Sequence, residues 1–567
     1  MALKEGTHEQ LVYDVVCVGA GGAGVTVAVW ASNSGLSTAL LSKEPAGYGN
    51  TRMSGGSIVF PGISEGDGKN TFYHDLMKGG EYINQEELVR IMASHGAEGI
   101  LILEEFGHAF FRDDKGMITS DLLTKWGGHS CARTISSPGK MGSLIGQVLR
   151  GALARSEVDL FEDTVACRLL VKDNRIEGVI CLDLVSGKVF PIYAKAVILA
   201  TGGLGWMYYP RTSNFRTVCG DGFALAFDAG CEMIDMEMVQ FLPFSFTHPS
   251  FIQGIGVGDP MAAGPYGRLI NKDGEVVLEK MNVLTRAQVA KVIALEIAKG
   301  KGTEHGGLIL DLRGNLGKED GMKAREPWVS MGLFDPVMEV HGIEAFRWEK
   351  PWDVAPTAHF MMGGVRVDGQ GRSSVDGLFA VGEIRGGLHG ANRLGSVALA
   401  EIFISGKSTA DTLESYCKKC KLPEPEEDTF KKERDKVLSL FGRKGRIRPI
   451  LLKKGIHDLM WETTGPVREK MKMEDGLAKV DKIESMLDDL NISPFKEYNL
   501  EVLDAIEAEF MVKTAKMITT SALVRKESRG AHTRLDFPDR DDQNWLGNIV
   551  LKQEGTQIRW HFLRKGN

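Results

Sequence analysis

Three features are missing from this 567-residue sequence, and each absence excludes a class of protein. No apolar run is long enough to span a bilayer, which argues against direct membrane insertion. Basic residues are not in excess: 68 Lys and Arg stand against 75 Asp and Glu, so a general nucleic-acid binder is not expected. The opening segment, MALKEGTHEQ, has no apolar stretch typical of a signal peptide. We therefore expect a cytoplasmic chain that would be peripheral at a membrane only through a partner subunit.

Cysteine is also scarce and shows no framework spacing. Two of the eight cysteines, Cys417 and Cys420, form a CxxC pair, which is too few thiols for a tetrahedral zinc or iron–sulfur site. We interpret the pair as a bystander on a helix, with a redox or interface role left open. No other cluster of Cys and His has metal-ligand spacing, so we expect no metal. The remaining thiols are expected to be reduced: Cys17, Cys131, Cys167, Cys181, Cys219 and Cys231.

Glycine, in contrast, is abundant: 68 residues against 19 prolines. The sequence predicts a buried strand over Leu11–Val18, then the run GAGGAG, then a helix over 25–34 and a second strand from Thr38. In such a βαβ start, the first glycine allows a tight turn, the second a close approach to a pyrophosphate, and the third close packing of helix on strand. Gly19, Gly21 and Gly24 fit these positions, and therefore predict a dinucleotide site.

The pattern of apolar, charged and glycine residues changes along the chain. A strand at 196–199 leads into ATGG, residues near 236–350 are irregular, and GLFAVG at 377–382 returns to the buried-strand pattern. Beyond 411 the spacing is helical and charged, and from about 530 the chain is polar and irregular with one strand-like stretch at 548–551. We predict four parts: a dinucleotide-binding domain of 1–235 plus 350–410, an inserted domain of 236–349, a helical domain of 411–525 and a tail of 526–567.

Nine segments then carry a resemblance to a known family. They are VGAGGAG at 18–24, SK at 42–43, GNTRMSGG at 49–56, ATGG at 200–203, GDG at 220–222, PTAHFMMGG at 356–364, GLFAVGEI at 377–384, HGANRLGS at 389–396 and ESRGAHTRLDFPDRDD at 527–542. In this order the set resembles the flavoprotein subunits of succinate dehydrogenase and fumarate reductase. The resemblance covers nearly the whole chain.

The resemblance implies an α/β fold: a Rossmann-like FAD-binding domain with an inserted α+β capping domain, then a helical C-terminal domain. Family members that bind FAD covalently do so through a histidine in a motif similar to SHTVAAQGG, and Gly49 takes that place here. FAD is therefore expected to be non-covalent. The implied cofactor contacts are Gly19, Gly21, Gly22, Ala23, Gly24, Ser42, Lys43, Asn50, Thr51, Ser54, Gly55, Gly56, Ala166, Ala200, Thr201, Gly202, Asp221, Glu383, Ala398 and Leu399.

The resemblance also implies three catalytic residues. His359 and Arg393 match the family's carboxylate clamp, and Arg286, in VLTRAQVA, matches its general acid or base. The expected chemistry is hydride transfer between flavin N5 and a CH–CH or CH=CH unit next to a carboxylate or carbonyl. A clamp neutralises the negative charge that develops in the transition state, and the planar fork of arginine suits a carboxylate.

Two positions depart from the family pattern. Leu242, in QFLP, takes the place of a histidine that usually holds the second carboxylate, and Asp259-Pro260 takes the place of a Thr-Glu pair. The relay arginine falls at Ala263, where Arg268 or Tyr266 could substitute. Leucine cannot hydrogen-bond a carboxylate and an aspartate repels one. The departures favour a substrate with a single carboxylate or carbonyl; alternatively, the insert is shifted and other residues bind the second group.

The tail resembles that of members that form complexes, so we expect the partner to be an iron–sulfur electron-transfer subunit and the substrate to be a small-molecule enoate. A second hypothesis is an electron-relay flavoprotein subunit without an organic substrate of its own. The retained His359, Arg393 and Arg286 argue against it. A 3-ketosteroid dehydrogenase would need tyrosines to serve as acid and base, and only Tyr266 lies near the insert.

Overall fold

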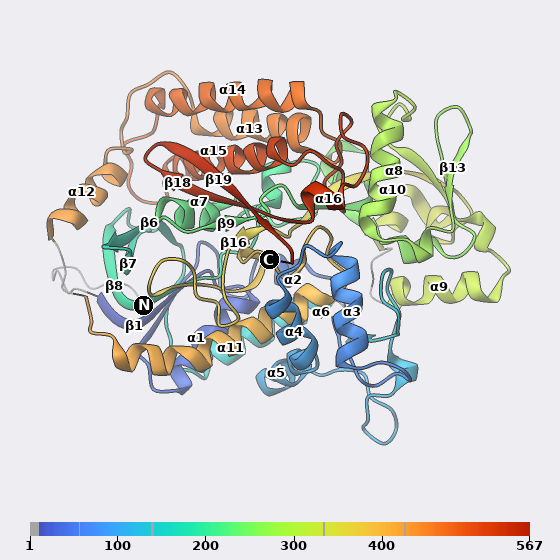
Figure 1. Cartoon of the computed structure of the whole chain (residues 1–567), viewed down its shortest axis with the longest axis horizontal. Helices are drawn as coiled ribbons and strands as arrows, with labels where there is room; N and C mark the ends of the chain where they lie inside the picture. Colours follow the sequence, from blue (N-terminus) through green and yellow to red (C-terminus); the bar gives the residue numbers. More distant parts are fainter. Residues whose placement is uncertain are drawn as a thin grey trace.

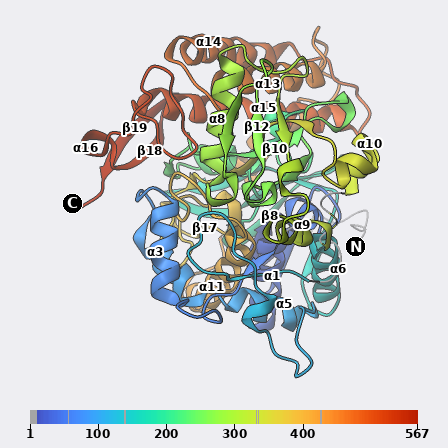
Figure 2. The same ribbon diagram turned by 90° about the vertical axis from the view of Figure 1, so that its right-hand side faces the viewer.

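The computed structural model describes residues 11–55, 57–137, 141–330, 332, 335–423 and 427–566. Gly56, one of the expected cofactor contacts, lies outside these residues. Two bodies are seen in Figure 1, a larger one that carries both the N-terminal and C-terminal segments and a smaller one formed by the light-green middle of the chain. Figure 2 looks at the smaller body from its own side.

The larger body is built on a seven-stranded sheet in the order β5-β2-β1-β8-β7-β6, with β17 also paired to β8. Strands β5, β2, β1, β8 and β17 are parallel neighbours, whereas β6, β7 and β8 pair antiparallel. The predicted strand over Leu11–Val18 is confirmed, and its last four residues are buried because the sheet is covered. The strands are β1 (Leu11–Val18), β2 (Thr38–Leu41), β5 (Asp159–Phe161), β6 (Thr164–Lys172), β7 (Arg175–Asp183), β8 (Val189–Leu199) and β17 (Leu378–Ala380).

Helices cover this sheet and the loops beside it. The predicted helix over 25–34 is confirmed as α1 (Gly22–Asn33), which begins three residues earlier, within the glycine run. It packs against the long α11 (Val397–Lys419), although the two are far apart in sequence. The other helices of this region are α2 (Asn50–Met53), α3 (Lys69–Gly79), α4 (Glu86–His95), α5 (Glu98–Phe106), α6 (Met141–Ala154) and α7 (Asp221–Asp228). A two-stranded sheet joins β3 (Ile58–Val59) to β4 (Thr134–Ile135).

The smaller body is a six-stranded sheet in the order β11-β10-β15-β14-β12-β13, with helices packed on it. It has a hydrophobic core of its own, which includes Phe244, Phe246 and Trp348. Its strands are β10 (Val239–Phe246), β11 (Gly256–Gly258), β12 (Arg268–Ile270), β13 (Val276–Glu279), β14 (Leu308–Asp311) and β15 (Trp352–Met361), and its helices are α8 (Arg286–Ala298), α9 (Glu319–Ser330) and α10 (Asp335–Phe346). The predicted α+β insertion in a Rossmann-like fold is thus confirmed; the domain limits stay a prediction.

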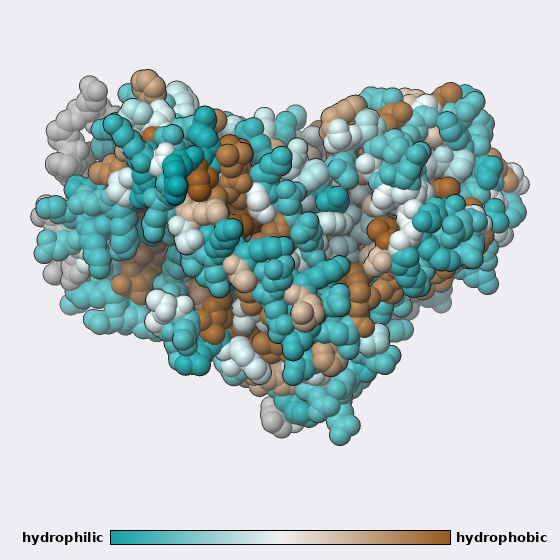
Figure 3. All heavy atoms as spheres, turned by 90° about the horizontal axis from the view of Figure 1, so that it is seen from above, coloured by the Kyte–Doolittle hydropathy of each residue, from teal (hydrophilic) through white to brown (hydrophobic). Residues whose placement is uncertain are grey.

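The C-terminal part supplies a bundle of helices, as predicted. Helices α13, α14 and α15 pack on one another and α15 reaches α7 of the larger body. The bounds are α12 (Glu427–Leu438), α13 (Pro449–Thr464), α14 (Lys470–Met486), α15 (Leu500–Val524) and α16 (Asp542–Trp545). None of the helices in the described part of the chain is both long and apolar enough to cross a membrane. Seen from above, the surface is mostly hydrophilic with separated hydrophobic patches (Figure 3).

The tail differs from the sequence expectation of an irregular segment. It forms a hairpin of β18 (Gly547–Glu554) and β19 (Gln557–Arg564), and β18 also pairs with β9 (Met233–Ile234), which in turn pairs with β16 (Gly364–Val365). The strand-like stretch at 548–551 lies within β18, but the expectation of an otherwise irregular tail was wrong. The side chains of β19 are exposed or half-buried, so this strand has no buried-strand pattern in the sequence.

A buried charge network fastens the tail to the body. Arg525, fully buried after α15, donates to Glu237 Oε1 at 2.6 Å and to Glu527 Oε1 at 2.9 Å. Its guanidinium also donates to the carbonyl oxygens of Trp545 and Gly547, next to the hairpin. Both carboxylates are fully buried; Arg525 is the ion-pair partner of Glu237, and it shares Glu527 with Arg529.

We predict that Arg525→Ala lowers the free energy of unfolding by about 3–5 kcal/mol, because it removes the guanidinium that forms an ion pair with the buried carboxylate of Glu237. The measurement is the midpoint of urea unfolding of the flavin-loaded protein. Arg559→Ala is the control: this arginine pairs with Glu554 on the exposed face of the hairpin, where an ion pair contributes at most about 1 kcal/mol. Equal midpoints for the two variants would contradict the prediction.

Candidate functional site

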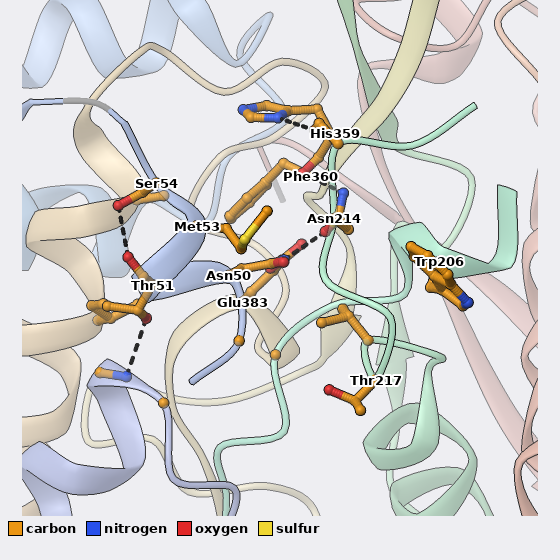
Figure 4. A pocket seen from close by; sticks show the side chains of 18 of the residues that line it. Asn50, Thr51, Met53, Ser54, Trp206, Asn214, Thr217, His359, Phe360 and Glu383 are labelled. Carbon is orange, nitrogen blue, oxygen red and sulfur yellow. Dashed lines mark hydrogen bonds between the residues drawn. The ribbon is translucent and has the colours of Figure 1, made fainter. Parts of the chain in front are cut away.

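A cavity of about 660 Å³ lies where the two bodies meet. This volume is typical of a ligand site. The cavity is lined by all three expected catalytic residues and by every expected cofactor contact among the described residues except Gly24, which lies behind the wall. Figure 4 shows part of it, with the side chains of Asn50, Asn214 and Glu383 pointing toward one another below His359.

One end of the cavity has the shape of a dinucleotide cradle. Gly19 has φ +108°, and a Cβ there would lie 2.4 Å from the carbonyl oxygen of Ala200. A Cβ on Gly24 would lie 1.8 Å from the carbonyl oxygen of Gly19, so helix and strand pack too closely for any side chain. Helix α1 begins at Gly22, after Gly21, which has no side chain to cap the helix. The amide of Gly22 donates to Thr51 Oγ1 at 3.2 Å, and the positive dipole end of the helix lies at the cavity wall. These features fit a pyrophosphate.

Two buried polar atoms in the cavity wall support the same assignment. Thr201 Oγ1 and Asp221 Oδ1 have no hydrogen-bond partner among the described residues. The other carboxylate oxygen of Asp221 forms an ion pair with Lys43 at 2.6 Å. Unpartnered buried polar atoms are costly, and hydroxyl groups such as those of a ribose can satisfy them. The residues present therefore fit FAD.

The lysine at this end has a second partner that sequence reasoning missed. Lys43 Nζ lies 2.7 Å from Glu507 Oε1, and Glu507 also pairs with Lys453 at 2.5 Å. Burial alone would lower the pKa of Lys43, but the carboxylates of Asp221 and Glu507 raise it, so the ammonium group stays charged. Glu507 comes from α15, far from the glycine-rich motif in sequence, and no local pattern marks it.

The opposite end of the cavity holds the candidate catalytic residues. His359 lies on β15 and its Nδ1 is 2.8 Å from Ser213 Oγ. Arg393 lies in the loop before α11, donates from Nε to Gln240 Oε1 at 3.3 Å and has its guanidinium 4.5 Å from the centre of the Phe360 ring. No sequence pattern pointed to Ser213, and Gln240 was marked only as part of the QFLP segment.

Arg286 is the first residue of α8. The helix starts there because Thr285 and Gln288 form a reciprocal capping box. Arg286 Nε donates to the carboxylate of Asp259, while its buried Nη1 has no partner among the described residues. The ring of Trp126 lies beneath the guanidinium at 5.9 Å. One guanidinium nitrogen thus remains available to a ligand.

The electrostatics of this end favour an anion. Burial and the neighbouring guanidinium groups of Arg286 and Arg393 hold the pKa of His359 well below its usual range, so the imidazole is neutral. Burial and the repulsion from Arg286 lower the pKa of Arg393 to about 9, which still leaves it protonated at neutral pH. Burial raises the pKa of Glu383, on the same cavity wall, to about 7. Arg286 and Arg393 thus lie on the same buried wall, and a bound carboxylate would compensate the positive charge that the ion pair between Arg286 and Asp259 leaves.

The structure changes how the two departures from the family pattern are interpreted. Leu242 lines the cavity and is almost fully buried. Asp259 also lines it, but its charge is paired with Arg286, so the expected repulsion of a carboxylate by a free aspartate does not apply. Arg268 pairs with Asp311 at 3.2 Å and Tyr266 donates to Asp320 at 3.1 Å, and neither lines the cavity.

The CxxC pair lies elsewhere. Cys417, near the end of α11, is buried and its thiol donates to the carbonyl oxygen of Asp14 at 3.6 Å. Cys420 is the residue after the helix, and both cysteines are free thiols. Neither contributes to the cavity.

Fold and site together define a flavin-dependent oxidoreductase, with a dinucleotide cradle at one end of the cavity and a cationic wall at the other. Residues 14–399 match the model of the FAD binding domain, and residues 453–564 match that of the fumarate reductase flavoprotein C-terminal domain. The chain belongs to the family of fumarate reductase and succinate dehydrogenase flavoprotein subunits, which are FAD-dependent oxidoreductases.

Relatives are similar over almost their full length. One of the subunits of the fumarate reductase (CoM/CoB) of Methanothermobacter marburgensis is 33% identical over 554 residues, covering 95% of this chain and 97% of the relative. The succinate dehydrogenase flavoprotein subunit of Rickettsia conorii is 30% identical over 568 residues, covering 95% and 92%. A structure of the quinol fumarate reductase flavoprotein of E. coli superposes with a TM-score of 0.87 at 26% identity and covers 98% of this chain and 97% of that one.

Proposed function

We propose that this chain is a catalytic flavoprotein subunit that transfers hydride to or from a carbon–carbon unit next to a carboxylate or carbonyl. One observation carries the proposal: a neutral imidazole and two guanidinium groups line the same cavity as the dinucleotide cradle. When bound, FAD supplies the hydride donor and acceptor at N5. The contacts of the chain's own residues support a role for each of them.

His359 and Arg393 bind the carboxylate in this proposal. The Ser213 hydroxyl can donate to Nδ1 of the neutral His359, which leaves Nε2–H as a donor aimed at substrate. Arg393 is held in place by Gln240 and by the face of Phe360. A pre-positioned pair of donors stabilises negative charge that develops next to the reacting bond.

Arg286 moves the proton. Its unpartnered Nη1 is the nitrogen available to substrate, and the ion pair with Asp259 gives the guanidinium a carboxylate to which a proton can be passed. Asp259 lines the cavity at the first position of the family's Thr-Glu pair, one residue before the position of the family's acidic residue. We infer that it acts as the relay in place of a longer chain of groups.

The substrate in this proposal has one carboxylate or carbonyl and an uncharged remainder. Leu242 presents an apolar side chain at the position of the expected second donor, in contact with the strand that carries Gly256. A second carboxylate placed against Leu242 would lose its hydration without gaining a hydrogen bond. The name of the relative from Methanothermobacter marburgensis states fumarate reduction, so dicarboxylates belong in any substrate panel.

We further propose that FAD is non-covalent and that electrons reach it from a partner subunit that carries iron–sulfur clusters. Gly49, in the loop before α2, has no side chain to which flavin could be attached. The described cysteines are free and scattered, so they offer no cluster set of their own. Relatives named as subunits support a partner, through which the chain would associate with a larger complex.

We predict that His359→Ala and Arg393→Ala each slow reoxidation of the reduced flavoprotein by an enoate about 10²–10³-fold, as expected when a preorganised donor is lost. Stopped-flow absorbance of the flavin over a panel of mono- and dicarboxylic enoates measures the rate. Arg446→Ala, a change at an arginine whose side chain is 88% exposed, is the matched control and leaves the rate unchanged. If no enoate oxidises the wild-type flavin, the electron-relay alternative is supported instead.

Acid precipitation tests the mode of flavin attachment. Because Gly49 cannot form a bond to the flavin, all of the FAD should remain in the supernatant and the washed pellet should be colourless. A yellow pellet after denaturation would show a covalent link and overturn the assignment.

Leu242→His should improve the rate with dicarboxylic enoates relative to monocarboxylic ones by about tenfold to a hundredfold, the effect of one hydrogen bond to a charged group. The measurement is the ratio of kcat/KM values for the two substrate classes. Leu242→Met, which keeps an apolar side chain of similar volume, should leave the ratio as in the wild type. Equal ratios in all three proteins would remove Leu242 from the specificity argument.

A further inference from the structure

A second group of chemically competent side chains lies in the six-stranded sheet, away from the cavity. His248 follows the end of β10, His305 lies on the turn between α8 and β14, and Asp353 is the second residue of β15. The sheet brings the three together because β15 pairs with both β10 and β14. Phe246, at the end of β10, is opposite Val354, and Ile309 of β14 is opposite Asp353. None of the three lines the cavity.

Their ligating atoms converge. One ring nitrogen of each histidine and a carboxylate oxygen of Asp353 all lie within 4.8 Å of one another. The rings of His248 and His305 face each other with centroids 3.8 Å apart and planes inclined at 26°. The ring of His341, from α10, lies 5.2 Å from that of His248.

The surroundings orient these groups. The hydroxyl of Thr247 is 3.0 Å from Nδ1 of His248, which leaves Nε2 of that ring available. Glu304 Oε1 lies 3.6 Å from Nε2 of His305. His341 Nε2 is buried and has no hydrogen-bond partner among the described residues, so the cluster contains an unsatisfied imidazole nitrogen.

We propose that His248, His305 and Asp353 form a binding site for a divalent transition-metal ion such as Zn²⁺. Two imidazoles and one carboxylate are a donor set that zinc prefers, with water or Glu304 available for the fourth position. The hydrogen bond between Thr247 and His248 supplies the outer support that metal-bound histidines need. His305 lies on an exposed turn, so a metal ion can reach the cluster from solvent.

The location gives such a metal a consequence for the substrate cavity. The segment after His248 contributes Phe251, Gln253 and Ile255 to the cavity wall, and the side chain of Phe251 is 81% exposed. A metal bound at His248 would anchor the start of this segment to β15 and to the 301–307 turn. We therefore expect metal binding to stabilise this part of the wall.

The test uses untagged, flavin-loaded protein stripped with a chelator and titrated with ZnCl₂ by calorimetry. We expect one zinc ion per chain, and a Co²⁺-substituted protein should show the intense d–d absorption of a low-coordinate site. His305→Ala and Asp353→Asn should each weaken zinc binding by more than about tenfold. His561→Ala, at an exposed histidine of β19, is the control and should bind zinc as the wild type does.

Two results would overturn the proposal. Wild-type protein that takes up no stoichiometric zinc has no such site. Unchanged zinc affinity in both His305→Ala and Asp353→Asn would place the ion elsewhere, for example on His359. Retained flavin absorbance and unchanged enoate turnover in these variants, measured without metal, establish that they are folded.

Discussion

The burial of two guanidinium groups in one cavity wall is the constraint on which the rest of the site depends. Arg286 and Arg393 repel each other, and Arg286 forms an ion pair with Asp259. Desolvated like charges are unfavourable, and the nearby carboxylates of Glu383, Asp259 and Glu401 offset part of this cost at Arg393. Gln240 and the ring of Phe360 hold its guanidinium in place. The two guanidinium groups make the wall a receptor for an anion. Burial, together with these two groups, holds the pKa of His359 well below its usual range, which keeps the imidazole neutral.

This arrangement requires both bodies of the protein. Arg286 begins a helix of the smaller body, and Arg393 comes from a loop of the larger one. His359 lies on β15, which belongs to the six-stranded sheet and pairs with β10 along the wall of the cavity. The cationic end of the cavity therefore exists only when the two bodies are held together, and a small displacement of one would separate the donors.

The sequence predicted those parts of the site that are encoded locally. The strand over Leu11–Val18 and the glycines that follow it form a recognisable local pattern. A side chain at Gly24 would collide with the carbonyl oxygen of Gly19, and one at Gly19 with that of Ala200, at the end of β8. Glu507 and Ser213 could not be predicted, since each reaches the site through tertiary packing between distant segments. Most of the C-terminal hairpin was missed because the side chains of β19 are exposed or half-buried and form no buried-strand pattern.

The cluster of His248, His305 and Asp353 could not be predicted from the sequence either. His248, His305 and Asp353 are separated by about fifty residues from one to the next, so no spacing rule for metal ligands could detect them. Antiparallel pairing of β10, β15 and β14 places the three at one end of the sheet. Strand β15 also carries His359, six residues beyond Asp353, on the portion that faces the cavity. One strand thus connects the cluster to the candidate carboxylate clamp, so a group bound at the cluster acts on the same rigid element that positions the imidazole.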